Sequence, residues 1–98
     1  MVWTGVNLDG ADFSGDHTSL GDSQLLNASL RGALLVGTYM GAGSLAGSDL
    51  TDADMTGLNT DFGVGLEGVD VTGVTWTNTT CPDGSNSDTN GDNSCEGH

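Results

Sequence analysis

Oxygen-bearing side chains alternate along the C-terminal tail, at Asp88, Asn90 and Asp92. The opening of a calcium-binding loop places its ligands in this way. The glycine expected at the sixth position of such a loop is Asn93, and the glutamate expected at the twelfth would lie beyond His98. Asp and Asn are also common turn residues. The tail is therefore either a candidate calcium site or a solvated turn, and calcium is the only cofactor that the sequence suggests.

The two cysteines, Cys81 and Cys95, flank a polar stretch that begins with Pro82. A disulfide between them would close a loop of about 15 residues and contribute on the order of 3 kcal/mol. Such a bond would fold residues 82–94 back over the preceding structure. It would also favour an extracytoplasmic location, because disulfides do not persist in a reducing cytosol. The alternative is two reduced thiols, one buried and one on a mobile tail.

Catalytic machinery does not emerge from the sequence pattern. The glycines form no G-x-G-x-x-G between a strand and a helix, and no argument from spacing brings Ser, His and Asp together. Lys and Arg together number 1, so the chain offers no basic clamp for a phosphate or an oxyanion. We therefore predict that the protein is not an enzyme and has no catalytic residues.

Acidic residues dominate the charge of the chain. Its 98 residues include 14 Asp and Glu, 17 Gly and a single basic residue, for a formal net charge of −13. Such a surface disfavours nucleic acid and anionic membranes as direct partners and permits cationic ones. No apolar run approaches the ~18 residues that cross a bilayer. Low hydrophobicity with high charge is typical of disorder, so a folded chain of this composition requires a strong repeat.

Large apolar residues recur at every fifth position, most clearly from Leu25 to Leu45. Two residues before each of these centres lies a small or β-branched residue, as in "ADF", "SDL" and "ADM". In an extended segment these two side chains point to the same side, and the polar, Gly-rich pair that follows makes a turn. Four such sides would close a square coil of about 20 residues, with coils stacked at ~4.8 Å.

Stacking of every fourth repeat predicts which side chains share a side. One side should collect Leu20, Met40, Phe62 and Cys81, each two residues after a threonine: Thr18, Thr38, Thr60 and Thr79. The predicted core stack comprises Leu20, Leu25, Leu30, Leu35, Met40, Leu45, Leu50, Met55, Phe62, Leu66, Val71 and Trp76. The repeat breaks after Phe13 and after Met55, which predicts protruding loops at residues 14–19 and 56–61.

Both breaks follow the same side of the coil, so we expect the two loops to protrude from one corner. The side chains that would gather there form a candidate binding patch: Asp16, His17, Asp22, Tyr39, Asn59 and Asp61. The alternative is an ordinary solvated surface, because an exposed His beside an Asp usually binds nothing.

The five-residue motif, carried by residues 1–81, resembles the pentapeptide-repeat family. The resemblance implies an all-β fold, a right-handed quadrilateral β-helix of about four coils at ~4.8 Å. The segment "VTWTNTTCPDGSNSDTNGDNSCEGH", residues 74–98, is similar to the ending of some exported bacterial members. We therefore expect a β-helix at 1–81, a disulfide-closed acidic tail at 82–98, and a secreted, periplasmic or cell-surface location.

Three functions fit these features. The first is a non-catalytic structural or protein-interaction module of an exported bacterial protein, with an unidentified protein partner. The second is nucleic-acid mimicry, because some pentapeptide-repeat proteins resemble duplex DNA and bind DNA gyrase. The charge fits this function, but about four coils form a rod of only ~20 Å. The third is a calcium- or ligand-binding surface module.

The N-terminus enters the pattern in mid-repeat, because Trp3 is already a repeat centre. The first coil should therefore be open and expose Trp3 and Leu8. Open coil edges and exposed apolar side chains favour association. We expect either a homodimer formed by end-to-end stacking of this coil or a preceding domain that covers it.

Overall fold

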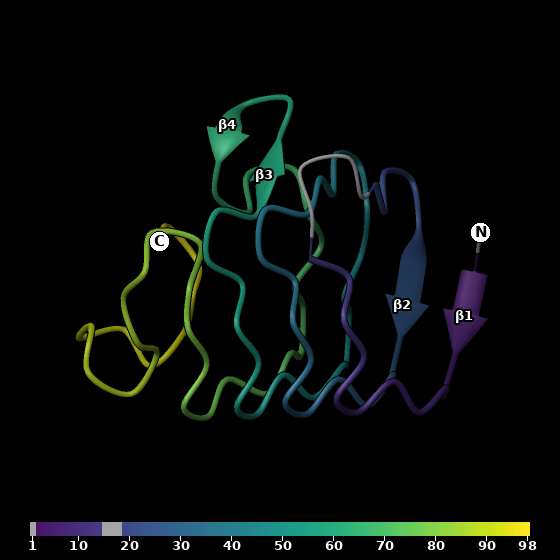
Figure 1. The fold of residues 1–98 in the computed structure, drawn as a ribbon, viewed down its shortest axis with the longest axis horizontal. Helices are drawn as coiled ribbons and strands as arrows, with labels where there is room; N and C mark the ends of the chain where they lie inside the picture. Colours follow the sequence, from purple (N-terminus) through teal and green to yellow (C-terminus); the bar gives the residue numbers. More distant parts are fainter. Residues whose placement is uncertain (1, 15–18) are drawn as a thin grey trace.

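The computed structural model describes residues 2–14 and 19–98, which form a stack of coils with the two termini at opposite ends (Figure 1). Its strands are short: β1 (Val2–Thr4), β2 (Gln24–Leu26), β3 (Asn59–Thr60) and β4 (Gly63–Val64). Strands β1 and β2 pair in parallel, with Trp3 opposite Leu25. Strands β3 and β4 form an antiparallel hairpin that projects from the stack (Figure 1). Within the described residues, no helix has the length and apolar character needed to cross a membrane.

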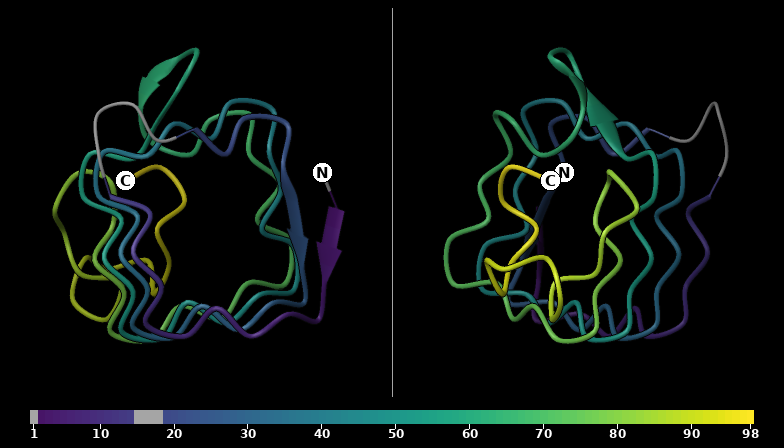
Figure 2. Two further views of the ribbon diagram at one scale, coloured as in Figure 1. Left: turned by 45° about the vertical axis from the view of Figure 1, so that its right-hand side comes forward. Right: turned by 90° about the vertical axis from the view of Figure 1, so that its left-hand side faces the viewer.

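Single parallel bridges, arranged in four ladders, join the coils to one another. The ladders are Asn7–Ser29–Asp49–Thr75, Asp12–Leu34–Asp54–Thr80, Ser19–Tyr39–Asn59 and Gln24–Ser44–Asp70. Viewed from nearer the stack axis, the successive coils superpose as a square outline (Figure 2). Every fourth repeat thus lies beside its counterpart in the next coil, which gives the extended segments their backbone partners.

The corners of the coils are tight turns that recur with the repeat. At a representative corner, the Ala33 amide donates to the Leu30 carbonyl at 3.1 Å, and the residue before Ala33, Gly32, has φ 69°. A positive φ at the third residue matches a type II turn, where Gly, Asn and Asp are favoured. The same corner position has positive φ at Gly5, Gly10, Asp22, Asn27, Gly32, Gly37, Ala42, Gly47, Asp52, Gly57, Gly68, Gly73 and Asn78.

The interior of the stack contains the predicted apolar centres. The centres with no exposed surface are Leu30, Leu35, Met40, Leu45, Leu50 and Met55. Leu20, Val71 and Trp76 are partly buried and pack against this core. Small residues two positions earlier, such as Ala28, Ala33 and Ala53, are buried beside the large ones. The period of five therefore identifies the inward-facing side chains over most of the chain.

The predicted register is wrong at the second break. Asn59 bridges to Tyr39, which places Thr60 at the centre position that follows Met55. Leu58 then takes the inward position two residues before this centre, and its side chain is fully buried. Phe62 is 68% exposed and lies in the turn of the β3–β4 hairpin. The coil is therefore regular through residue 60, and the protruding segment is 61–65 rather than the predicted loop 56–61.

The late sides of the stack are displaced by one repeat as a consequence. Asp70 bridges to Ser44, which puts Val71 over Leu45, and Thr75 bridges to Asp49, which puts Trp76 over Leu50. Thr79 thus joins the side of the inward alanines instead of a column of threonines. The inserted hairpin accounts for the whole displacement, because the repeat on either side of it keeps its spacing.

Outward-facing aspartates close the corners that follow them. The Asp54 carboxylate accepts hydrogen bonds from the Thr56 amide at 3.0 Å and from its hydroxyl at 2.6 Å, and Asp49 bonds to Thr51 in the same way. Asp70 accepts the Thr72 amide at 3.0 Å. These bonds lower the pKa of Asp49 and of Asp70, since hydrogen bonding favours the ionised carboxylate. Much of the negative charge thus stabilises turns.

Candidate functional site

Tyr39 and Asp61 form the central contact of the predicted binding patch. The Tyr39 hydroxyl donates to the Asp61 carboxylate at 2.5 Å. This bond raises the pKa of the Tyr39 phenol, and the negative charges of Asp61 and Asp22 add to the effect. The Tyr39 ring lies against two turn glycines, since a Cβ at Gly41 would collide with its hydroxyl and a Cβ at Gly21 would approach the ring to 2.9 Å.

The other predicted patch residues are placed less favourably for binding. Asn59 donates its side-chain amide to the carbonyl oxygens of Gly37 at 3.3 Å and of Gly57 at 3.1 Å, so the amide is used within the coils. Asp16 and His17 lie outside the described residues. The structure therefore brings Tyr39, Asp61 and Asp22 into one neighbourhood, and Asn59 beside them in the ladder. This arrangement fixes the base of the β3–β4 hairpin.

Two of the three candidate calcium ligands form side-chain hydrogen bonds with other residues of the tail. The Asn90 side-chain amide donates to the Ser94 carbonyl at 2.8 Å, and its oxygen accepts the Asp92 amide at 3.0 Å. The Asp92 carboxylate contacts His98 at 2.5 Å, and Asp88 is exposed. Among the described residues there is no group of three or more His, Cys, Asp and Glu that could hold a metal ion. A calcium site in the tail stays a prediction.

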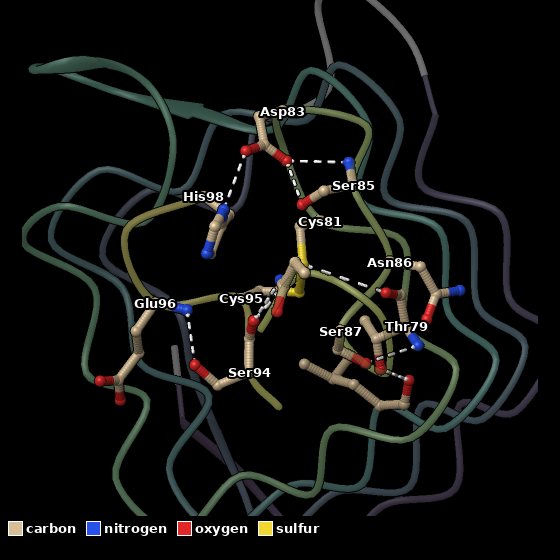
Figure 3. Close-up of a disulfide and its surroundings, with 12 residues drawn as sticks. Thr79, Cys81, Asp83, Ser85, Asn86, Ser87, Ser94, Cys95, Glu96 and His98 are labelled. Carbon is tan, nitrogen blue, oxygen red and sulfur yellow. Dashed lines mark hydrogen bonds and ion pairs between the residues drawn. A yellow bond between two sulfur atoms is a disulfide. The ribbon is translucent and has the colours of Figure 1, made fainter. Parts of the chain in front are cut away.

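Cys81 and Cys95 form a disulfide at the C-terminal end of the stack (Figure 3). Both cysteines are fully buried. The bonded tail supplies backbone partners to the last side of the last coil: the Cys81 amide donates to Ser85 at 2.7 Å, and the Asp83 amide donates to His98 at 2.6 Å. The Ser87 amide donates to the Thr79 carbonyl at 2.9 Å. The tail thus takes the place of a further coil on this side.

His98 is held between two carboxylates of the tail. Its Nδ1 lies 3.1 Å from Asp83 and its Nε2 lies 2.5 Å from Asp92. Hydrogen bonds to Asp92 and Asp83 raise the pKa of His98. The pKa of Asp83 is lowered, first by its bonds to Ser85 and then by His98. The cationic form of His98 is therefore favoured, and it links the end of the described chain to the start of the tail.

A groove of about 720 Å³ lies between the β4 segment, the last coil and the tail. Its apolar lining comes from Val64, Leu66, Val69 and Val71, and its acidic lining comes from Glu67, Asp70, Asp83 and Glu96. His98 is its basic side chain, and that ring is already paired with Asp83. The groove is therefore apolar at its floor and negatively charged at its margins.

Two large apolar side chains are exposed on the hairpin beside this groove. Phe62 is 68% exposed and Val64 is 66% exposed. Elsewhere in the described part of the chain, exposed large hydrophobic residues occur singly, at Val2 and Leu34. Sequence reasoning missed the hairpin because it assigned Phe62 to the core, and missed the groove because its walls are distant in sequence. The absence of a five-residue period in "DFGVG", residues 61–65, is the signal that points to the hairpin.

The comparison with protein families agrees with this architecture. Residues 23–59 match the family model "Pentapeptide repeats" in 8 copies. This segment is therefore composed of pentapeptide repeats, which confirms the family resemblance found in the sequence. The fold belongs with the β-helical solenoids, and the disulfide closes its C-terminal end.

One solved structure with a similar repeat is HetL, a pentapeptide repeat protein of the cyanobacterium Nostoc sp. strain PCC 7120 that is involved in heterocyst differentiation regulation. The two proteins share 20% sequence identity with a TM-score of 0.45, and the alignment covers 86% of this chain. The chain spans 50% of the length of HetL. No curated protein matches the chain in sequence.

Proposed function

We propose that this protein is a non-catalytic interaction module of an exported bacterial protein, and that a protein partner docks at the C-terminal groove and the adjacent hairpin. The observation that carries the proposal is the exposure of Phe62 and Val64, 68% and 66%, beside a groove with an apolar floor. Exposed apolar side chains rimmed by polar groups are typical of protein-interaction sites. The rigid stack holds the hairpin in place, so little ordering entropy opposes docking.

Export and the finer geometry of the coil are part of the same proposal. The Cys81–Cys95 disulfide supports an oxidising compartment. The four ladders of parallel bridges and the match to pentapeptide repeats support a right-handed square coil of about four turns. The division into a β-helix at 1–81 and a tail at 82–98 is supported by the tail's role as a partial cap.

DNA gyrase binding by charge mimicry is the second candidate function. The net charge of −13 favours it. Against it, the bonds of Asp49, Asp54 and Asp70 to neighbouring Thr residues give those carboxylates a local role in the fold. The use of aspartate in the turns of the repeat therefore explains part of the negative charge without nucleic-acid mimicry.

Site-specific photo-crosslinking in the native host tests the proposed function. A benzophenone amino acid replaces Val64 in the hairpin, and the control replaces Leu34, which is 39% exposed and does not line the groove. We expect a crosslinked protein adduct from position 64 and none from position 34. Equal adducts at both positions, or none at either, would rule out a docking site at the groove.

A further inference from the structure

Each coil offers the next coil the same three backbone groups on a given side. Between the second-last and last coils, the Leu45 amide donates to Asp70 and the Gly47 amide to Thr72, both at 2.8 Å. In return, the Asp70 amide donates to the Gly43 carbonyl at 3.2 Å. The preceding pair of coils repeats the pattern. Two N–H groups and one C=O group on this side therefore face each following coil.

On the last coil, these three groups have no partner. They are the amides of Val71 and Gly73 and the carbonyl of Val69, and no described residue forms a hydrogen bond with any of them. Two corners further, the tail satisfies the equivalent groups of Thr79, Cys81 and Asp83. The side between, with Val74, Trp76 and Asn78, is also unpaired but does not line the groove. The tail is thus a cap for one side, and the groove contains an open strand edge.

An open edge inside a groove is suited to pairing with an extended peptide. The unpaired segment contributes Val69, Asp70, Val71 and Thr72 to the groove lining. A strand added to such an edge gains backbone hydrogen bonds, while the groove walls select its side chains. The hairpin lies beyond one end of this edge, and the tail lies beside the edge, across the end of the coil (Figure 2).

The charge around the edge determines which strand it accepts. Glu67, Asp70 and Glu96 line the groove without a basic partner among the described residues. A second copy of this sequence fits poorly there, because its net charge is −13 and Arg31 is its single Lys or Arg. A strand with Lys or Arg side chains is complementary to these carboxylates.

The register of the coils predicts the sequence of this strand. In the coils, the Asp70 backbone bonds to Gly43 and Leu45 of the preceding coil. A peptide residue whose backbone bonded in the same way to Val69 and Val71 would have its side chain pointing outward, beside that of Asp70. Its two neighbours would point inward over Val69 and Val71, because side chains alternate along a strand. The pattern is therefore apolar, basic, apolar.

We propose that the groove binds an extended cationic segment of the partner protein, of the pattern apolar–Lys/Arg–apolar, as an added strand on the Val69–Gly73 edge. This inference rests on the proposed function and names the chemistry of its partner. The backbone of the segment pairs with Val69, Val71 and Gly73, its basic side chain lies beside Asp70, and its apolar side chains cover the floor of the groove.

Peptide titration of the whole, disulfide-bonded protein tests the proposal. The probe is the acetylated hexapeptide Gly-Val-Lys-Val-Thr-Gly. One control peptide carries Glu in place of Lys, and the other carries a methyl group on the backbone amide nitrogen of Lys. We expect the amide exchange of Val71 and Gly73 to slow when the probe binds. Loss of one backbone hydrogen bond in the N-methyl peptide should weaken binding by about 2- to 10-fold. The Glu peptide should bind more weakly still.

A matched pair of protein variants separates the local carboxylate from net charge. Asp70→Asn and Asp54→Asn remove the same charge from the same kind of corner, since each carboxylate accepts the amide of a following Thr at 3.0 Å. We expect Asp70→Asn to weaken probe binding by about 2- to 5-fold and Asp54→Asn to leave it within error. Equal effects of the two variants would reduce the recognition to general charge and overturn the proposal.

The remaining outcomes are also decisive. Equal binding of the N-methyl peptide would exclude strand pairing, and equal binding of the Glu peptide would exclude a cationic ligand. A concentration-dependent dimer that protects Val71 and Gly73 without peptide would assign the edge to a second copy and overturn the proposal. If no peptide binds but position 64 still crosslinks to a partner, the strand inference fails while the proposed function stands. If neither occurs, both fail.

Discussion

The Cys81–Cys95 disulfide should be what keeps the tail docked on the last coil, and Cys95→Ser tests this. The bond joins residues 14 apart in sequence, and a loop of this size contributes about 3 kcal/mol. Residues 83–98 contain no apolar side chain other than Cys95. Hydrogen bonds must therefore offset the ordering of the tail, at about 0.5–1.5 kcal/mol per bond against about 1–2 kcal/mol per ordered residue. Without the disulfide, the ordering cost prevails.

The expected result is local release of the tail with the coils intact. The Gly57 amide still donates to the Pro82 carbonyl at 2.9 Å, and the Thr80 amide to Ala53, so the last coil remains attached. Amide exchange should become fast at Cys81 and Asp83. The free energy of unfolding measured in urea should fall by about 3 kcal/mol. Ser94→Ala, which leaves the disulfide in place, is the control. A loss below about 1 kcal/mol with Cys81 and Asp83 still protected would refute this reasoning.

Three further predictions concern register, backbone strain and pH. Leu58→Ala should lower the free energy of unfolding in urea by about 2–5 kcal/mol because Leu58 is fully buried, whereas Phe62→Ala should change it by less than about 0.5 kcal/mol. A larger loss for Phe62→Ala than for Leu58→Ala would support the register predicted from sequence instead. Ala42 has φ 57°, so Ala42→Gly should stabilise the protein by about 1 kcal/mol. Gly47→Ala should lower the thermal midpoint, because Gly47 has φ 72° and a Cβ there would collide with Asn27. A destabilising effect of Ala42→Gly would contradict the turn geometry. Because the pKa of His98 is raised by its two aspartate partners, its stabilisation of the tail should be fully present below about pH 6.5 and lost as pH rises through the raised pKa; a ring titration by NMR at or below the unperturbed value would count against this link.

The period of five predicted most of the core because it reflects a repeated local geometry. Each inward pair is followed by a polar turn in which Gly, Asn or Asp adopts positive φ, so pattern and backbone agree from residue to residue. The family resemblance rests on the same pattern, and residues 23–59 confirm it. Leu30, Met40 and Leu50 are fully buried as expected.

The register failed where side-chain size and position in the turn gave opposite indications. The size and apolar character of Phe62 predict a core position, but large apolar residues are not confined to the interior. Thr56-Gly57 followed by Leu58 continues the corner chemistry, with Gly57 at φ 74°, and identifies Leu58 as the inward residue. The turn sequence therefore predicts the inward position better than the size of the side chain does.

The groove could not be predicted from sequence because it exists only after the tail has folded back. Its walls come from residues 64–72 on one side and from Asp83 and Glu96–His98 on the other. These segments are brought together by the disulfide and by the hydrogen bond between the Asp83 amide and the His98 carbonyl. The unpaired edge of Val69–Gly73 depends in turn on how much of the coil the tail covers.

The tail's contacts have a consequence for how solenoids of this type change length. Residues 83–98 form hydrogen bonds with Asn78, Thr79 and Cys81 of the last coil and a disulfide with Cys81. Among the described residues, the tail bonds to the preceding coil only through the Pro82 carbonyl, which accepts the Gly57 amide. In a repeat protein each unit contacts only its neighbours, so whole coils duplicated or deleted upstream would leave these contacts intact. The last coil and its tail thus form a C-terminal unit that can end a longer or a shorter solenoid, and the groove is retained in either case.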